Sequence, residues 1–374
     1  MIDPLQFYNY LSEKGLNFFT GVPDSLLKEL CLCITENSPA SHNIIAANEG
    51  NALAIASGYH LATSQIGVVY LQNSGLGNLV NPILSLNDEA VYKIPALLII
   101  GWRGEPHLKD EPQHAKQGEI TLKLLDTLGV KYFILESDYQ TTIEESLKYI
   151  KETSLPVALI VKKNTFSKYD ATVKKSDEKY QLTREAALKE VIDNLDESDF
   201  IVSTTGKTSR EIFEIRKNNH QGHENDFLTV GSMGHTSSIA LGMSLGTKKN
   251  VYCIDGDGSF LMHMGAGAIN ASIAQDNFKY LIINNGAHES VGGQPTVAFN
   301  INLDEVLLAL GFNKVYQAYS TADIKRYLNL LKTEKLSAMV IYTKQGSRND
   351  LGRPTLSPQE NKINFMKKIK GDQN

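Results

Sequence analysis

Residues 251–289 read VYCIDGDGSFLMHMGAGAINASIAQDNFKYLIINNGAHE and decide the fold of the chain. The stretch opens with the apolar run VYCI, turns sharply at DGDGS (255–259), passes through a helical segment of small residues, and ends with a second apolar run before NNG (284–286). Strand, turn, helix and strand in this order predict one βαβ unit of a parallel sheet. Because parallel strands end at the same edge, we expect Asp257 and Asn285 to lie close together.

The side chains expected at this edge carry oxygen atoms. A carboxylate, an amide oxygen and exposed backbone carbonyls are ligands for Mg²⁺ or Ca²⁺ and not for zinc. Two or three protein ligands leave octahedral Mg²⁺ open to phosphate oxygens. Gly256 and Gly258 allow the backbone to approach a ligand closely, and a helix starting near Ser259 offers free N–H groups to an anion. The stretch therefore predicts a metal-bridged diphosphate site.

GDG followed by NN at this separation resembles the signature of thiamine-diphosphate (ThDP) enzymes. A glycine-rich turn of any doubly wound fold is the alternative for GDG alone, and the NN pair after the next strand argues against it. The resemblance implies that Asp257, Asn285 and the backbone carbonyl of Ala287 hold Mg²⁺. It also implies the cofactor-binding residues Gly256, Asp257, Gly258, Ser259 and Asn285.

The segment TGVPDSLL (20–27) predicts the end of a strand, a turn and the start of a helix. Helix capping is the usual role of an aspartate such as Asp24 at this position. The segment also resembles the strand and G-x-P turn that open the pyrimidine-binding domain of ThDP decarboxylases. That resemblance places Gly21 and Pro23 in the cofactor site and Asp24 in the substrate site.

NEGNALAIASGY (48–59) predicts a helix of small residues that starts beside Glu49. A glutamate at a helix start is usually a partner of the helix dipole, although small residues also permit close packing against another surface. The stretch resembles the E-x-x-A…A-x-G-Y segment of ThDP enzymes, in which the glutamate hydrogen-bonds the pyrimidine ring. The resemblance therefore implies that Glu49 binds the cofactor and is the catalytic residue.

Two further polar segments follow apolar runs in the first half of the chain. QNSGLGN (72–78) lacks the third glycine of a dinucleotide-binding motif. It resembles the glycine-rich loop that lines the active site of ThDP enzymes, which places Ser74, Gly75 and Asn78 in the cofactor site. The charged loop 102–114 emerges where ligands bind in α/β folds, and Arg103 and His114 there are candidate substrate ligands.

In the second half, GKTS (206–209) resembles the end of a phosphate-binding P-loop. The Walker pattern needs a glycine where Ile201 stands, so a P-loop is excluded. Gly206, Lys207 and Thr208 remain cofactor-binding candidates at a sheet edge.

The loop GSMGH (231–235) resembles the ThDP segment whose bulky apolar residue lies between the two rings of the cofactor. This resemblance implies cofactor contacts for Met233 and its neighbour Ser232, whereas core packing is the usual role of a methionine. We expect the glycine-rich segment 286–296 to be a mobile or ligand-covering loop rather than a regular element. Within it, His288 is a candidate substrate ligand.

Composition limits the class of protein. The chain has 374 residues and a formal net charge of −5, which is ordinary for a soluble α/β protein and does not indicate nucleic-acid binding. Residues 1–10 lack a signal-peptide pattern, and no apolar run reaches transmembrane length. Cys31, Cys33 and Cys253 are expected to be reduced packing residues. We therefore expect a cytoplasmic protein with no membrane or nucleic-acid partner.

The fold class expected is α/β, with two doubly wound parallel-sheet domains of the ThDP-binding fold. We predict a pyrimidine-binding domain at 1–166, a linker at 167–182 and a diphosphate-binding domain at 183–374, with no middle domain. In ThDP enzymes the two kinds of domain from different chains face each other. The resemblance therefore implies a homo-oligomer, at least a dimer, with the active site between subunits.

The resemblance covers essentially the whole chain and is to the phosphonopyruvate decarboxylase family of ThDP enzymes. It implies conversion of 3-phosphonopyruvate to phosphonoacetaldehyde and CO₂, in phosphonate (2-aminoethylphosphonate) biosynthesis. Three further hypotheses stay open: a sulfopyruvate decarboxylase, which is a near relative, a carboligase like acetolactate synthase, and a non-catalytic ThDP-binding module. The side chains that could bind the phosphonate stay open between Arg103, His114, Lys207, Arg210, Arg348 and Arg353.

Overall fold

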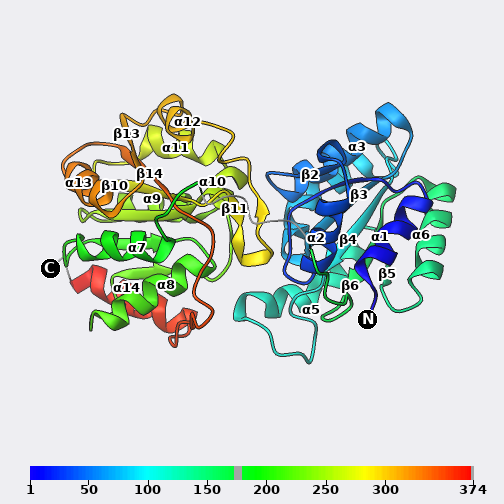
Figure 1. Ribbon diagram of the computed structural model, residues 1–374, viewed down its shortest axis with the longest axis horizontal. Helices are drawn as coiled ribbons and strands as arrows, with labels where there is room; N and C mark the ends of the chain where they lie inside the picture. Colours follow the sequence, from blue (N-terminus) through cyan, green and yellow to red (C-terminus); the bar gives the residue numbers. More distant parts are fainter. Residues whose placement is uncertain (172–178, 372–374) are drawn as a thin grey trace. The chain divides into compact units, whose positions relative to one another are not determined.

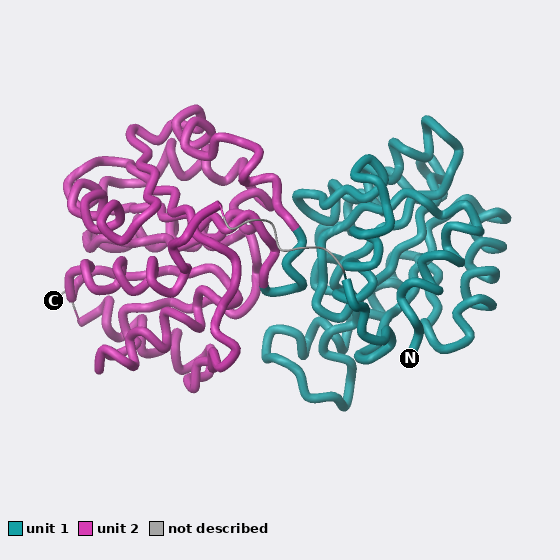
Figure 2. Tube along the Cα trace, viewed as in Figure 1, with its two compact units in different colours: residues 1–174, 290–294 teal, residues 175–289, 295–374 magenta. Residues whose placement is uncertain are grey.

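The computed structural model describes residues 1–171 and 179–371. The predicted linker, 167–182, includes residues 172–178, which lie outside the described part of the chain. No helix among the described residues is long and apolar enough to cross a membrane. The chain forms two compact units (Figure 2), of which the first contains residues 1–174 and 290–294 and the second residues 175–289 and 295–374.

The first unit is built on a six-stranded sheet with strand order β2-β1-β3-β4-β6-β5, in which all neighbours are parallel (Figure 1). Helices α1, α2 and α6 pack on one face, and α3, α4 and α5 pack on the other. The strands are β1 (Phe18–Gly21), β2 (Asn43–Ile45), β3 (Gly67–Gln72), β4 (Ala96–Gly101), β5 (Lys131–Ile134) and β6 (Val157–Val161). The helices are α1 (Pro4–Glu13), α2 (Lys28–Asn37), α3 (Glu49–Thr63), α4 (Leu76–Pro82), α5 (Pro112–Thr127) and α6 (Tyr139–Thr153).

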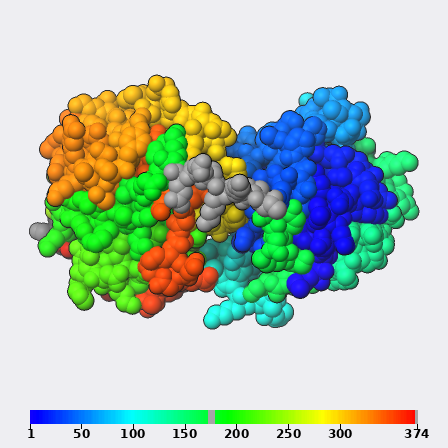
Figure 3. Space-filling view, in the orientation of Figure 1, coloured from blue at the N-terminus to red at the C-terminus, as the bar shows by residue number. Residues whose placement is uncertain are grey.

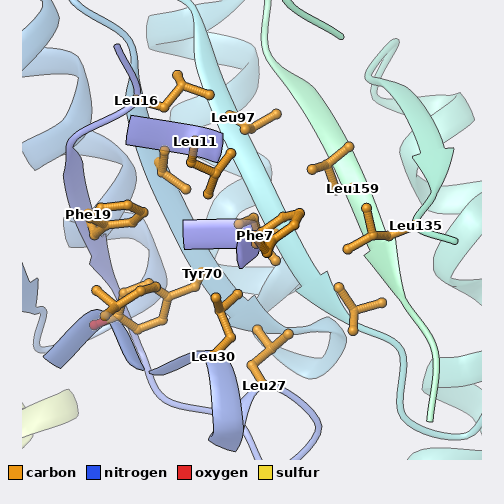
Figure 4. Packing of buried hydrophobic residues seen from close by; sticks show 14 of the residues in the cluster. Phe7, Leu11, Leu16, Phe19, Leu27, Leu30, Tyr70, Leu97, Leu135 and Leu159 are labelled. Carbon is orange, nitrogen blue, oxygen red and sulfur yellow. The ribbon is translucent and has the colours of Figure 1, made fainter. Parts of the chain in front are cut away.

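Because helices cover both faces of this sheet, its central strands are continuous apolar runs rather than alternating ones. Figure 4 shows Phe19, Tyr70 and Leu97 on one face of the sheet beside Phe7 and Leu11 of α1. All five side chains are almost completely buried. Burying one such side chain stabilises a fold by about 1.5–3 kcal/mol, so these contacts fix the helix against the sheet.

The second unit repeats the architecture with the strand order β8-β7-β9-β10-β14-β13, again parallel throughout. Helices α7, α8 and α13 pack on one face, and α9, α10, α11 and α12 pack on the other. The strands are β7 (Phe200–Ser203), β8 (Asp226–Leu228), β9 (Val251–Gly256), β10 (Phe278–Asn284), β13 (Lys314–Ala318) and β14 (Ser337–Tyr342). The helices are α7 (Arg184–Asp193), α8 (Lys207–Asn218), α9 (Thr236–Gly246), α10 (Asp257–Met262), α11 (Gly265–Ile273), α12 (Leu303–Ala309) and α13 (Thr321–Leu331).

The two sheets share one topology. Numbered within its own unit, each sheet runs 2-1-3-4-6-5, so the connection after the second strand crosses over the first to reach the third. Ligands of doubly wound sheets bind where the strand order reverses, at the carboxyl ends of the strands. That point lies after β1 and β3 in the first unit and after β7 and β9 in the second. The predicted fold class of two doubly wound parallel sheets is confirmed.

Two features of the chain differ from the expectation. Segment 286–296, predicted as a loop, contains the short strands β11 (Ala287–His288) and β12 (Gln294–Pro295), and Thr296 N–H closes the hairpin on Gly286 O at 2.9 Å. A terminal helix, α14 (Pro358–Gly371), was not predicted at all.

Helix α14 covers the free edge of β8. Its Asn361 donates to Asp226 O at 2.8 Å and accepts from Leu228 N–H at 3.2 Å, which satisfies backbone groups of an edge strand. The segment before α14, orange-red in Figure 3, lies on the surface beside α7 and α8. There Arg348 contacts both Glu185 and Glu214.

Candidate active site

The carboxyl edge of the second sheet brings Asp257 and Asn285 together, as predicted. Ile283 pairs with Gly256, so the residues that follow β9 and β10 emerge side by side. The backbone N–H of Asn285 donates to the Asp257 carboxylate, and the Thr296 hydroxyl donates to Asp257 Oδ2 at 2.5 Å. Both side chains are buried.

The Asp257 carboxylate has no basic partner within the described part of the chain. Burial raises the pKa of this carboxyl to about 6, and only hydrogen bonds oppose that effect. Burying an anion without a nearby cation costs free energy, so a bound cation would stabilise the site. Asn285 Oδ1 accepts from Ala287 N–H at 3.1 Å, and Ala287 is also buried. A carboxylate, an amide oxygen and a backbone carbonyl match the oxygen ligands that Mg²⁺ prefers.

The backbone at Gly258 is in close contact with two predicted site residues. A Cβ atom added there would lie 3.0 Å from His288 Cε1 and 3.4 Å from Met233 Cε. Gly234 N–H donates to Ser259 Oγ at 3.0 Å, which ties the loop after β8 to the first turn of α10. Burial lowers the pKa of His288 to about 4, so its imidazole is neutral at pH 7. Ser232, exposed and with φ 55°, precedes Met233 in this loop.

A second group of charged residues gathers beside Asn285. Lys207 follows Gly206, whose φ of 96° allows the chain to turn into α8, and Lys207 Nζ lies 3.0 Å from Glu289 Oε1. Glu289 Oε2 accepts from Arg184 Nη1 at 2.7 Å and from Asn285 Nδ2 at 2.9 Å. Burial raises the pKa of Glu289, but Arg184 and Lys207 outweigh burial and hold it below its usual range.

The sequence predicted Lys207 as a site residue, but Arg184 and Glu289 were missed. Arg184 also forms a bidentate pair with Glu211, with distances of 2.7 and 2.9 Å. Glu289 is the last residue of the stretch 251–289. Its position just beyond NNG is the sequence feature that could have identified it as a site residue. Thr208, a predicted cofactor residue, is buried in the first turn of α8.

In the first unit, Glu49 meets the loop after β3. Glu49 is the first residue of α3, and Asn78 Nδ2 donates to its Oε2 at 2.6 Å. A Cβ atom at Gly75 would lie 2.2 Å from Glu49 Oε1, so a larger residue there would displace the Glu49 carboxylate. Glu49, Gly75 and Asn78 therefore form one cluster, while Ser74 is exposed and bonds Gln72 at 2.7 Å.

The turn after β1 holds a buried carboxylate. Asp24 is fully buried, accepts from Gln72 Nε2 at 2.5 Å and from Leu26 N–H at 3.0 Å, and its pKa is raised by burial. Helix α2 starts later and has no side-chain cap, so the capping interpretation of Asp24 is wrong. Pro23 is buried beside it, and Gly21 has no room for a Cβ atom because Tyr70 O would lie 2.1 Å away.

Of the two candidate substrate residues in the charged loop, Arg103 already pairs with a carboxylate and His114 is neutral at pH 7. Arg103 binds both oxygens of Asp110, with its Nε 2.8 Å from Oδ2, and donates to Ser25 Oγ at 2.7 Å. This pairing lowers the pKa of Asp110 to about 2. His114 is buried, and burial together with the charge of Arg103 lowers its pKa to about 4.

His114 leads to a prediction about acid stability. Its folded-state pKa is about 4 against an ordinary 6.5, so the unfolded chain binds more protons between these values. The stability contributed by neutral His114 is present above pH ~6.5 and is lost as the pH falls toward ~4. We expect His114→Gln to reduce the loss of unfolding free energy between pH 7 and pH 4.5 by roughly 1–3 kcal/mol, measured by denaturant titration. The control is His107→Gln, at an exposed position of the same loop, which should lose as much unfolding free energy between pH 7 and pH 4.5 as wild type. An equal loss in wild type and His114→Gln would contradict the prediction.

Comparison with known proteins agrees with this geometry. The family described as "Thiamine pyrophosphate enzyme, N-terminal TPP binding domain" matches residues 6–127, and its "C-terminal TPP binding domain" matches residues 204–340. The chain therefore belongs to the thiamine pyrophosphate enzymes. It carries these N- and C-terminal domains without a middle domain between them.

Individual relatives show which thiamine pyrophosphate enzymes the chain resembles. Phosphonopyruvate decarboxylase of Streptomyces viridochromogenes is 32% identical over 368 residues, which are 94% of this chain and 90% of the relative. Phosphonopyruvate decarboxylase of Streptomyces hygroscopicus is 32% identical over 369 residues, with the same coverage. Sulfopyruvate decarboxylase of Methanosarcina acetivorans is 27% identical over 374 residues, covering 94% of this chain and 93% of the relative. These relatives confirm the prediction of an enzyme of the decarboxylase class.

Proposed function

We propose that this protein uses ThDP and Mg²⁺ to convert 3-phosphonopyruvate to phosphonoacetaldehyde and CO₂, as a step of phosphonate biosynthesis. The observation that carries the proposal is the match along 94% of the chain to decarboxylases named for this substrate. Sulfopyruvate is the second candidate substrate, since a sulfopyruvate decarboxylase matches over the same share of the chain.

The residues of the second unit would hold the metal and the diphosphate. Asp257, Asn285 Oδ1 and the carbonyl of Ala287 would bind Mg²⁺, because together they offer hard oxygen ligands around a buried anion that lacks a cation. Met233, which lies against Gly258, would contact the rings of the cofactor. When bound, ThDP supplies a carbon nucleophile and an electron sink for the departing CO₂.

In the first unit, Glu49 would assist proton transfer. Glu49 is buried and bonded by Asn78, so its carboxyl is held in one position. We propose that it hydrogen-bonds the pyrimidine ring and stabilises the tautomer that can accept a proton. We also propose a cytoplasmic homo-oligomer, at least a dimer, with active sites between subunits, as the family resemblance implies.

The candidate cations for binding the phosphonate differ in the partners that surround them. Arg103 is paired with Asp110, and Arg348 binds Glu185, Glu214 and Asp350. His114 is neutral at pH 7. Lys207 and Arg210 follow β7 at the carboxyl edge of its sheet.

Lys207 and Arg210 lie in the first turns of α8. Among the residues that the structure describes, Lys207 forms an ion pair with Glu289 alone, and Arg210 forms none. We propose that these two side chains bind the phosphonate, whose charge and three acceptor oxygens suit several cations at once.

A substrate panel tests this assignment. Wild type should show the highest kcat/KM for 3-phosphonopyruvate, a lower value for sulfopyruvate, which has one charge fewer, and the lowest for pyruvate. Arg210→Met keeps the alkyl chain and loses the charge, so kcat/KM for 3-phosphonopyruvate should fall roughly 10- to 100-fold while that for pyruvate stays unchanged. Lys217→Met, at the exposed end of the same helix, is the matched control. A wild-type preference for sulfopyruvate would move the assignment to that substrate, and a preference for pyruvate would contradict anion recognition.

A further inference from the structure

Three hydrogen-bond donors converge on Glu289 in the second unit. Its Oε2 accepts from Arg184 Nη1 at 2.7 Å and from Asn285 Nδ2 at 2.9 Å, and its Oε1 lies 3.0 Å from Lys207 Nζ. The side chain is only 10% exposed. The proposed function uses Asn285 and Lys207 but gives no role to the carboxylate that joins them.

The contact with Asn285 determines how its amide is turned. A side-chain amide has a donor end and an acceptor end of nearly the same shape. A carboxylate can only accept hydrogen bonds, so the NH₂ group of Asn285 must face Glu289. The amide oxygen is then on the opposite end, where it accepts from Ala287 N–H at 3.1 Å. A cation can bind this oxygen but not the NH₂ group.

Glu289 is itself held in place. Arg184 is fixed by its bidentate pair with Glu211, and both residues are buried, so the guanidinium presents its remaining donor to Glu289 from a fixed direction. Lys207 holds the other carboxylate oxygen. Donors thus hold both carboxylate oxygens of Glu289, and the side chain presents acceptor oxygens to Asn285.

We propose that Glu289 is a positioning residue that keeps the oxygen of the Asn285 amide turned toward the metal position. The inference rests on the Mg²⁺ site of the proposed function. It explains why a buried carboxylate stands four residues beyond Asn285. Loss of a partner that orients a metal ligand typically weakens metal affinity about 10- to 100-fold.

The test measures metal binding rather than turnover. Mn²⁺ is titrated into each protein at a fixed ThDP concentration, and its dissociation constant is read by calorimetry. Glu289→Ala removes the acceptor for Asn285, and we expect Mn²⁺ affinity to fall about 10- to 100-fold. Glu289→Gln loses the same charge but keeps an acceptor oxygen, so its affinity should stay within about threefold of wild type.

Two further variants separate positioning from stability. Asp226→Asn weakens another buried ion pair of the second unit, the one with Arg216, and Asp226 bonds neither Asn285 nor Glu289. This variant should therefore lower the unfolding temperature and leave Mn²⁺ affinity unchanged. Asn285→Asp sets two carboxylates side by side and should weaken binding. Adding Glu289→Gln to Asn285→Asp should restore much of the affinity, because a carboxamide at 289 can donate to a carboxylate at 285.

Several results would overturn the inference. Equal losses of Mn²⁺ affinity in Glu289→Ala and Glu289→Gln would show that charge, not amide orientation, matters. A comparable loss in Asp226→Asn would show that the affinity follows the stability of the unit instead. Mn²⁺ affinity in a folded Glu289→Ala within about threefold of wild type would contradict positioning altogether. ThDP binding by wild type that needs no divalent cation would instead contradict the proposed metal site, and the inference with it.

Discussion

Asp257→Ala is expected to abolish Mg²⁺-dependent binding of ThDP. Asp257 is the charged member of the proposed ligand set, and a hard cation held by one amide oxygen and one carbonyl would bind very weakly. Calorimetry of ThDP binding with and without Mg²⁺ measures the effect directly. Wild type should bind tightly only with the metal, and the variant should show no difference between the two conditions.

A matched control comes from the hydroxyl that bonds Asp257. Thr296→Val removes the 2.5 Å hydrogen bond to Asp257 Oδ2 and leaves the carboxylate in place. We expect a loss of no more than about tenfold in metal affinity, the lower end for partners of metal ligands. Unchanged ThDP affinity in a folded Asp257→Ala protein would mean that the metal is held elsewhere.

Glu49→Gln is expected to give the second large effect. The substitution keeps the size of the side chain and an oxygen that can accept from Asn78, but it removes the acid. Exchange of the thiazolium C2 proton of bound ThDP, followed by NMR, should slow about 10²- to 10⁴-fold, the usual contribution of a positioned acid or base. kcat should fall in parallel.

The affinity for ThDP separates a catalytic role of Glu49 from a binding role. If Glu49 acts on the proton, Glu49→Gln should bind ThDP almost as tightly as wild type. Asn78→Ala, which frees the Glu49 carboxyl but keeps it, should show a much smaller loss of exchange rate. Near-normal exchange in Glu49→Gln would remove Glu49 from the mechanism.

The sequence predicted those parts of the site that depend on strand order. Asp257 and Asn285 lie beyond adjacent parallel strands, so the edge at which they meet follows from the βαβ unit alone. Glu49 and Asn78 were assigned separately, and the structure brings them together for the same reason, because both follow strands that end at one edge.

Other parts depend on contacts that no local pattern encodes. Arg184 and Glu289 are 105 residues apart, and their pairing follows from packing at the start of α7. Asp24 was open to interpretation as a helix cap because its spacing to an apolar run fits one, but α2 begins only at Lys28. Helix α14 was missed because it buries few residues, Asn361 and Phe365, and Asn361 is polar, so the apolar pattern of an amphipathic helix is weak despite their i, i+4 spacing.

We propose that this chain decarboxylates a phosphonate-bearing 2-keto acid with ThDP. The most direct measurement supplies 3-phosphonopyruvate to the purified protein and follows CO₂ and phosphonoacetaldehyde together, with and without ThDP and Mg²⁺. We predict equal amounts of both products, formed only when cofactor and metal are present. ThDP binding without CO₂ release from any of the three keto acids would indicate a non-catalytic binding module, and CO₂ release with a carbon–carbon coupled product in place of the aldehyde would indicate a carboligase; either result would contradict the account.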